Sequence, residues 1–236
     1  GAVAGDSAVT ATSPFRNPVA MPDSSQMSDK AARPGPGEVL LAIYKKEGDG
    51  SSSYEVGNQV WASYWYGHTY EIEGRRYFTG FAYNTGTPPE DDTGISAPGD
   101  RVSISQATYA IAPEGSVTVW EFAGAERDIG EFGGRERGNA IDEEASPQTL
   151  RTAGGDYLLA VSTWYLEAGV KAKTAELFML KRQRTHWQYL GSIATGNDNS
   201  ASCASDAMAK GLPPCVVNTG LLEFQSRHES EMPHIR

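Results

Sequence analysis

The chain has 236 residues, a formal net charge of −10 and only two cysteines. This acidic balance disfavours a nucleic-acid-binding protein, because such proteins need a basic surface to neutralise phosphates. The sequence contains no run of about 20 apolar residues, so it predicts no transmembrane segment. Its 5 Trp, 11 Tyr and 7 Phe argue against wholesale disorder and predict a globular protein with a sizeable core.

Residues 1–37 differ in composition from the rest of the chain, since they hold five of the 13 Pro and neither Trp nor Tyr. Such a stretch is typical of a tether between an exported protein, for example a lipoprotein, and its anchor. An ordinary unfolded terminus is the alternative. We therefore divide the chain into a Pro-rich N-terminal segment (1–37), a β-rich globular body (38–225) and a polar tail (226–236).

Short runs rich in β-branched and aromatic residues, separated by Gly, Pro and charged residues, predict strands along both halves of the body. In the first half the predicted strands cover 38–44, 54–66, 70–83, 102–112 and 117–122. The segment 70–83 is expected to form a hairpin that turns near Gly74. The alternation of 102–112, followed by Pro113 and Gly115, predicts a second hairpin.

In the second half the predicted strands cover 157–166, 175–180, 186–194, 216–217 and 221–224. The segment 174–184 contains many residues that favour helices, but it lies between two strand-like runs and we interpret it as a strand. The elements together predict an all-β protein of about ten strands, an antiparallel β-sandwich or barrel with at most one or two short helices.

The segment 123–155 is rich in Gly and acidic residues and contains no strand-like run. A structureless stretch of this length is uncommon in a compact domain, so we interpret it as a functional loop or as the boundary between two halves (38–122 and 156–225). A weak internal similarity favours related halves, with chance as the alternative: 76–86 and 187–196 each contain a central Gly, end in Thr-Gly and follow a Leu-Leu-Ala run. The central glycines predict a bulge or a close backbone approach.

Cys203 and Cys215 are separated by eleven residues. A disulfide between them would stabilise the fold by about 3 kcal/mol in the chain-entropy model, and a short helix beginning at Ser205 or Asp206 fits between them. Two inert thiols are the alternative. A metal site is not expected, because neither a His nor a third Cys lies nearby to complete four ligands. A structural disulfide implies an oxidising compartment, so we expect an exported protein that is periplasmic, on the outer surface or secreted.

Aromatic residues concentrate in the predicted strand 54–66. On an extended strand Trp61 and Trp65 point to one face, and Tyr64 and Tyr66 point to the other. Trp164 takes the corresponding place in the second half. If one face is exposed, these side chains form a stacking platform for sugar rings or for a protein partner. The alternative is that one face belongs to the core and loops partly cover the other.

Motifs for nucleophilic catalysis are missing, since the sequence contains no G-x-S-x-G, H-E-x-x-H or S-x-x-K. A carboxylate–histidine site would have to form from separate segments. Its weak candidates are two histidines and one acidic run: His68, His186, Asp142, Glu143 and Glu144. We interpret the acidic run as a solvated loop. The glycine-rich stretch 133–138 carries two Arg that could hold a phosphate or carboxylate, but no helix is predicted after it and we interpret it as a plain loop.

The leading hypothesis is an exported, non-enzymatic β module that binds a protein or glycan of the cell envelope and uses neither cofactor nor metal. It rests on the predicted disulfide, the tether-like N-terminal segment and the aromatic strands without a catalytic motif. A hydrolase with a carboxylate–histidine site between 123–155 and the sheet is the first alternative. A structural or assembly subunit, recognised by an unpaired edge strand, is the second.

Overall fold

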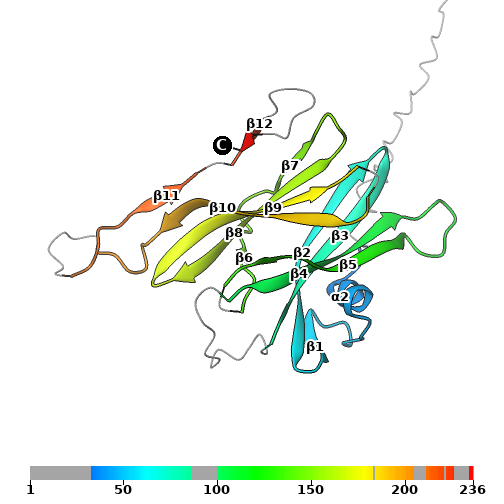
Figure 1. Ribbon diagram of the computed structural model, residues 1–236, viewed down its shortest axis with the longest axis horizontal. Coiled ribbons are helices and arrows are strands. Elements are labelled where there is room, and N and C mark those ends of the chain that lie inside the picture. Colours follow the sequence, from blue (N-terminus) through cyan, green and yellow to red (C-terminus); the bar gives the residue numbers. More distant parts are fainter. Residues whose placement is uncertain are drawn as a thin grey trace, which may run out of the picture. The chain divides into compact units, whose positions relative to one another are not determined.

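The computed structural model describes residues 33–86, 100–134, 136–182, 184–204, 211–220, 222–225 and 234–235. Within these residues, two antiparallel sheets pack against each other and one short helix accompanies them (Figure 1). This confirms the predicted all-β sandwich. The predicted tether (1–37) falls almost wholly outside the described residues, as do the helix predicted after Cys203 and most of the tail.

The first sheet has the strand order β1-β2-β3-β4-β5, so each strand pairs with its neighbour in the sequence. The turn between β2 and β3 contains Glu73 and Gly74, both with positive φ, which confirms the hairpin predicted near Gly74. β4 and β5 also pair as predicted, although β5 begins at Trp120 rather than at Val117. The strands are β1 (Ser53–Gly57), β2 (Val60–Ile72), β3 (Arg75–Thr85), β4 (Val102–Ile111) and β5 (Trp120–Phe132).

The second sheet has the strand order β11-β10-β9-β8-β6, and β7 also pairs with β8. Its strands are β6 (Ala140–Ile141), β7 (Gln148–Arg151), β8 (Tyr157–Glu167), β9 (Val170–Leu180), β10 (Trp187–Asp198) and β11 (Val217–Thr219). The strand interpretation of 175–180 is confirmed within β9, despite its helix-favouring composition. β12 (Phe224–Gln225) and β13 (His234–Ile235) form a separate pair, so part of the predicted polar tail is a strand.

The apolar run 38–44, predicted as a strand, lies in a helix, α2 (Pro36–Tyr44). Pro36 suits the first turn of a helix, where its missing N–H has no intrahelical partner to lose. The Glu38 carboxylate accepts the backbone N–H of Gly35 at 2.7 Å, which is the reciprocal contact of a helix N-terminus. The prediction was wrong because so short an apolar run fits either periodicity. The buried residues recur with helical spacing: Val39, Leu40, Ile43 and Tyr44.

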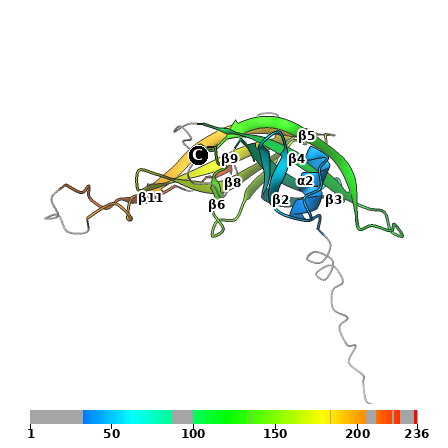
Figure 2. The same ribbon diagram turned by 90° about the horizontal axis from the view of Figure 1, so that it is seen from below.

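Helix α2 packs on the outer face of the first sheet, against β2, β3 and β4 (Figure 1 and Figure 2). The approach is close at the central glycine of β3, since a Cβ on Gly80 would lie 2.5 Å from Cγ2 of Val39. In β10 the corresponding Gly191 lies at a register shift and has a φ of 126°. Close approach and bulge, the two predicted roles of a central glycine, are both confirmed. The Leu-Leu-Ala run at 40–42 is helical, however, unlike that at 158–160, which weakens the internal similarity.

The segment 123–155, predicted to lack strands, contains most of β5 and all of β6 and β7. β5 is an edge strand, and Asp128, with a φ of 59°, lies within an interruption of its pairing with β4. Charged residues and an interrupted register remove the hydrophobic alternation by which strands are recognised. The chain passes from one sheet to the other between Phe132 and Ala140. This passage lies inside the segment 123–155, and β5, β6 and β7 extend the two sheets into it.

Large side chains fill the space between the sheets, among them Trp187 and Phe178, which are 1% and 0% exposed. The two sheets approach closely where β5 meets β10. A Cβ on Gly130 of β5 would lie only 2.5 Å from Cδ1 of Tyr189 of β10. A separate apolar cluster on the second sheet packs against residues 222–224. The first sheet thus carries α2 on its outer face and faces the second sheet with the other.

Cys203 and Cys215 form a disulfide, which confirms that prediction. Asn199 joins the two ends of this loop: its amide donates to the Pro214 carbonyl at 2.9 Å, and its Oδ1 accepts the Val216 N–H at 2.6 Å. A disulfide is compatible with export into an oxidising compartment. Among the residues that the structure describes, no helix is long and apolar enough to cross a membrane.

Candidate functional site

Glu176, on β9, is a fully buried acidic residue, and four donors surround its carboxylate. The Tyr189 hydroxyl donates to Oε2 at 2.6 Å, and Asn139 Nδ2 donates to Oε1 at 2.8 Å. The hydroxyls of Thr163 and Thr174 lie 3.2 and 3.3 Å from Oε1. A buried carboxylate is costly unless its oxygens accept hydrogen bonds. The four contacts supply these hydrogen bonds. They come from strands β8, β9 and β10 and from Asn139, in the connection between the two sheets.

The register of the second sheet explains how these groups meet. Residues two apart on a strand share a face, so Thr174 and Glu176 point inward together with the core residue Phe178. Thr163 on β8 lies opposite Thr174 in the ladder, and their hydroxyls are 2.6 Å apart. Tyr189 comes from β10, at the edge of a register shift. The inward face of β9 therefore changes from apolar to polar at Glu176.

A pocket of about 340 Å³ lies directly beside this network. Three of the four donors to Glu176 also line the pocket, namely Asn139, Thr174 and Tyr189. The volume is at the lower end of the range for small-molecule sites, which is about 300 to 1,000 Å³. Apolar, charged, hydroxyl and glycine residues complete the walls: Phe132, Tyr165, Leu166, Arg101, Glu167, Ser192, Gly133, Gly134 and Gly191.

Tyr189 stays protonated because its surroundings disfavour a phenolate. Burial raises the pKa of Tyr189 above its ordinary value, and the hydrogen bond to Glu176 and the charge of that carboxylate raise it further, whereas Arg101 lowers it. A phenol has one hydrogen to donate, and Glu176 holds it. The oxygen of Tyr189 therefore has only lone pairs left for a ligand.

Asn139 is also held through its backbone. The indole Nε1 of Trp65 donates to the Asn139 carbonyl oxygen at 2.8 Å. The Trp65 ring packs against Phe132 and Phe178, with centroid distances of 4.8 and 6.0 Å. Trp65 therefore lies behind the pocket, against the inter-sheet core, and fixes one of the pocket residues.

The structure does not gather the five predicted platform residues on one surface. The register of β2 shifts between Tyr64 and Tyr66, so Tyr64 packs on the helix side and Tyr66, like Trp65, packs against the inter-sheet core. The expectation that Tyr64 and Tyr66 share a face is therefore wrong, because the bulge was not visible in the sequence. Trp61 and Trp164 are both half-buried.

Sequence reasoning missed most of the residues that form this pocket, although Gly133 and Gly134 belong to the glycine-rich stretch 133–138 considered as a candidate. Adjacent residues on a strand face opposite sides, so it is Tyr165 and not the predicted Trp164 that lines the pocket. Trp164 instead lies against the Lys171 ammonium, 4.5 Å from the ring centroid. A signal for Glu176 was present in the sequence: within the predicted strand it is an acidic residue in phase with the apolar Phe178.

His68, a predicted catalytic candidate, is buried among aromatic side chains. Its ring stacks with Tyr66 and Tyr70 at centroid distances of 6.4 and 5.8 Å, and its Nε2 lies 3.3 Å from the Tyr157 hydroxyl. Burial lowers the pKa of His68 to about 4. The imidazole is therefore neutral at pH 7 and packs as a core residue.

His186 is largely exposed, and its Nδ1 lies 3.3 Å from Oε2 of Glu126 on β5. The segment 123–155 thus does place a carboxylate beside this histidine, but a different one from those predicted. In the described part of the chain, no hydrogen bond or ion pair joins the acidic run to either histidine, and no group of three or more His, Cys, Asp or Glu is arranged to hold a metal ion. The acidic run forms a local turn after β6: Asp142, Glu143 and Glu144.

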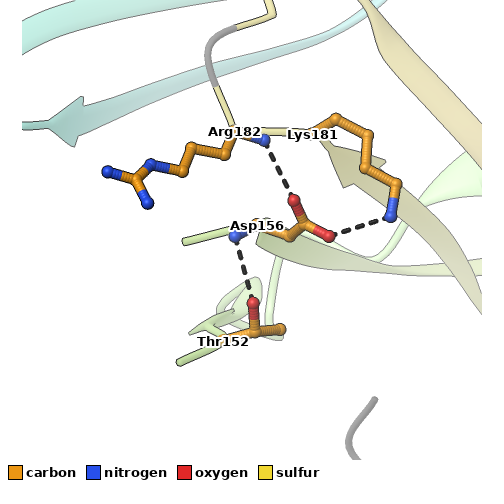
Figure 3. A network of polar contacts seen from close by, with 4 residues as sticks. All are labelled: Thr152, Asp156, Lys181 and Arg182. Carbon is orange, nitrogen blue, oxygen red and sulfur yellow. Dashed lines mark hydrogen bonds and ion pairs between the residues drawn. The ribbon is translucent and has the colours of Figure 1, made fainter. Parts of the chain in front are cut away.

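Asp156 ties the start of β8 to the end of β9 (Figure 3). Its carboxylate accepts Lys181 Nζ at 2.9 Å and the Arg182 N–H at 3.0 Å, and its own N–H donates to Thr152 Oγ1 at 3.0 Å. Burial alone would raise the pKa of Asp156, but the hydrogen bonds from Lys181 and Arg182 and the Lys181 charge outweigh it and hold that pKa below its ordinary value. We assign this cluster a structural role, since it lies at the start of β8, whereas the pocket residue Tyr165 lies near the other end of that strand.

Comparison with known proteins gives no match: no protein-family model, no curated protein and no solved structure is significantly similar to this chain. The pocket is therefore interpreted from its chemistry. It combines an exposed aromatic side chain, an amide, hydroxyl groups and one residue of each charge, all held by the two sheets. Convergent polar groups beside an aromatic side chain can bind a small polar ligand.

Proposed function

We propose that this chain is an exported, non-enzymatic module that binds a glycan segment in the pocket beside Glu176. The observation that carries the proposal is the combination of an aromatic wall with convergent polar groups in one pocket. Sugar rings have apolar faces that stack on aromatic side chains, and hydroxyls that need hydrogen-bond partners. Tyr165 supplies an aromatic side chain that is 39% exposed, and Asn139 and Tyr189 line the same pocket.

The polar groups of the pocket are fixed before a ligand arrives. Trp65 holds the Asn139 backbone, and Glu176 holds both the Asn139 amide and the Tyr189 hydroxyl. Groups that are already ordered lose little conformational entropy on binding, so each contact contributes more to affinity. This support favours a binding site over an incidental hollow between two sheets.

The carboxylates favour binding over hydrolysis. Glycoside hydrolysis uses two carboxyl groups about 5 to 9.5 Å apart, both of which reach the scissile bond. Glu176 is fully buried, and both its oxygens are occupied by protein donors. Glu167 is the one acidic side chain among the described residues that line the pocket. A paired acid and nucleophile therefore has no support here.

Export is supported by the disulfide between Cys203 and Cys215, because such bonds persist mainly in oxidising compartments. The composition of 1–37, with its prolines, adds to this as the composition of a tether. A glycan of the cell envelope is a ligand that an exported module would meet.

A glycan array tests the proposal. The purified chain, with its disulfide intact, should retain a subset of glycans, and Tyr165→Ala should lower their affinity about tenfold because the stacking surface is lost. Phe122→Ala is the matched control, since Phe122 is also an exposed aromatic residue, at 53%, but does not line the pocket. Failure to retain any glycan, or equal losses in the two variants, would contradict the proposal.

A further inference from the structure

The direction of the hydrogen bond between Tyr189 and Glu176 is fixed by chemistry. A carboxylate has no hydrogen to give, so the phenol must be the donor in the 2.6 Å contact with Oε2. Oε1 already has Asn139 Nδ2 at 2.8 Å and two threonine hydroxyls within 3.3 Å. Both oxygens of Glu176 therefore already accept hydrogen bonds from the protein.

The same network also takes up the hydrogens of Asn139 and Thr174. Asn139 Nδ2 faces both Glu176 and the Thr174 hydroxyl, the latter at 3.4 Å. The hydroxyls of Thr163 and Thr174 face each other and Glu176. The floor of the pocket, defined as Asn139, Thr174 and Tyr189, therefore directs its hydrogens into the network around Glu176 and leaves oxygen lone pairs for a ligand.

Charges around the floor disfavour an anionic ligand, because two negative groups stand against one positive group. An anion would meet the negative charge of Glu176 beneath the floor and of Glu167 in the wall. Arg101, which also lines the pocket and whose charge reaches the Tyr189 hydroxyl, offsets one of these two negative charges but not both. An uncharged ligand with hydroxyl hydrogens avoids this repulsion.

We infer that Glu176, acting through Tyr189, makes the floor of the pocket a hydrogen-bond acceptor, so that the pocket selects uncharged sugars that donate a hydroxyl hydrogen to Tyr189 and rejects their carboxylated counterparts. This inference rests on the proposed glycan binding and names its ligand class. Glu176 is a positioning residue here, since it orients Tyr189 without touching the ligand. Tyr189 is the specificity-determining residue.

Glu176→Gln tests the inference by reversing the direction of the hydrogen bond between residue 176 and Tyr189. A glutamine amide can donate to the Tyr189 oxygen, which frees the phenol hydrogen to point into the pocket, and the buried negative charge disappears. The probes are pairs of neutral oligosaccharides and their uronic-acid counterparts, measured by titration calorimetry. The wild type should prefer the neutral member of a pair at least about tenfold, and Glu176→Gln should reduce that preference by about tenfold.

A second variant keeps the test decisive if Glu176→Gln fails to fold. Tyr189→Phe retains the ring but removes the oxygen, so it should lower the affinity for the neutral sugar by about two- to tenfold. Tyr54→Phe is the control, because the Tyr54 hydroxyl donates to the Lys46 carbonyl away from the pocket. Thermal unfolding of each variant shows whether the fold is intact.

The outcomes separate this inference from the proposed function. A wild type that binds uronic acids as tightly as neutral sugars, with loss on Tyr165→Ala, would overturn the inference and leave the glycan-binding pocket standing. A preference unchanged in a folded Glu176→Gln variant would also overturn it, as would full affinity of Tyr189→Phe for the neutral sugar. A wild type that binds no glycan at all would overturn both.

Discussion

The indole Nε1 of Trp65 donates a hydrogen bond to the carbonyl oxygen of Asn139 at 2.8 Å, across 74 residues of sequence. The contact joins β2 of the first sheet to the connection between the sheets. Because the Asn139 amide donates to Glu176, Trp65 supports the pocket from behind. A residue predicted as part of an exposed platform therefore acts from the inter-sheet core.

Replacing Trp65 by Phe should keep an aromatic ring in the core while leaving the Asn139 carbonyl without this donor. We expect the free energy of unfolding to fall by about 1–3 kcal/mol, and glycan affinity to fall because Asn139 is less firmly held. Urea unfolding and calorimetric titration measure the two effects. Trp61→Phe, on the same strand and half-buried, is the control. Unchanged affinity in Trp65→Phe would show that this contact does not support the site.

Protonation of His68 should destabilise the fold. The pKa of His68 is about 4 in the folded chain, against an ordinary 6.5, so the unfolded state binds more protons between these values. The free energy of unfolding should therefore fall as the pH drops from about 6.5 to about 4, by up to about 3 kcal/mol. Chemical denaturation at several pH values measures this. The drop should shrink in His68→Gln and persist in His186→Gln, where the exposed histidine is removed; equal drops in both variants would argue against a buried neutral His68.

Asp156 should stabilise the fold while its carboxylate is ionised. Its folded pKa lies below the ordinary 3.8, so its contribution is present above that value and is lost as the pH falls through the folded pKa. Because the Lys181 side chain is 45% exposed, we expect Asp156→Asn to cost about 1 kcal/mol or less at pH 7. The difference from the wild type in denaturant unfolding should shrink as the pH falls below 3.8. Glu143→Gln, in the turn after β6, serves as the control; a difference that persists at low pH would mean that the charge of Asp156 is not its source.

Gly80 tests the packing of helix α2. A Cβ at Gly80 would lie 2.5 Å from Cγ2 of Val39, so Gly80→Ala should lower the free energy of unfolding by about 1–3 kcal/mol through overpacking. Trimming the neighbour in the double variant Gly80→Ala with Val39→Ala should cost less than the sum of the two single changes. Gly86→Ala is the control, because a Cβ there meets no atom within 4 Å. Strict additivity would indicate that α2 does not pack on β3 as described.

The elements recognised from sequence were those with local signals. The hairpin at Gly74 and the strand pair β4–β5 have alternation and turn residues within a few positions of each other. The prediction failed for helix α2, because nine residues are too few to distinguish the helical from the strand periodicity. Most of β5 was missed because an edge strand with a register interruption lacks a continuous buried face.

The pocket depends on information that one segment does not contain. Glu176 could be marked as an acidic residue in phase with Phe178, but its partners Asn139 and Tyr189 come from other elements and meet it only through the register of the second sheet. The bulge in β2, which directs Trp65 and Tyr66 to the same side, has no sequence signal of its own. The sequence therefore shows which residues could take part in a site, but only the fold shows which of them lie together.

The position of a bound glycan is the most direct test of the account. Titration of isotopically labelled protein with a glycan retained on the array, followed by NMR, should shift the backbone amides of the pocket most, those of Gly133, Gly134, Gly191 and Ser192. The amide of Gly115, in the turn between β4 and β5, should change little. Largest shifts at Gly115 or in other residues away from the pocket would contradict the claim that the pocket beside Glu176 binds the glycan.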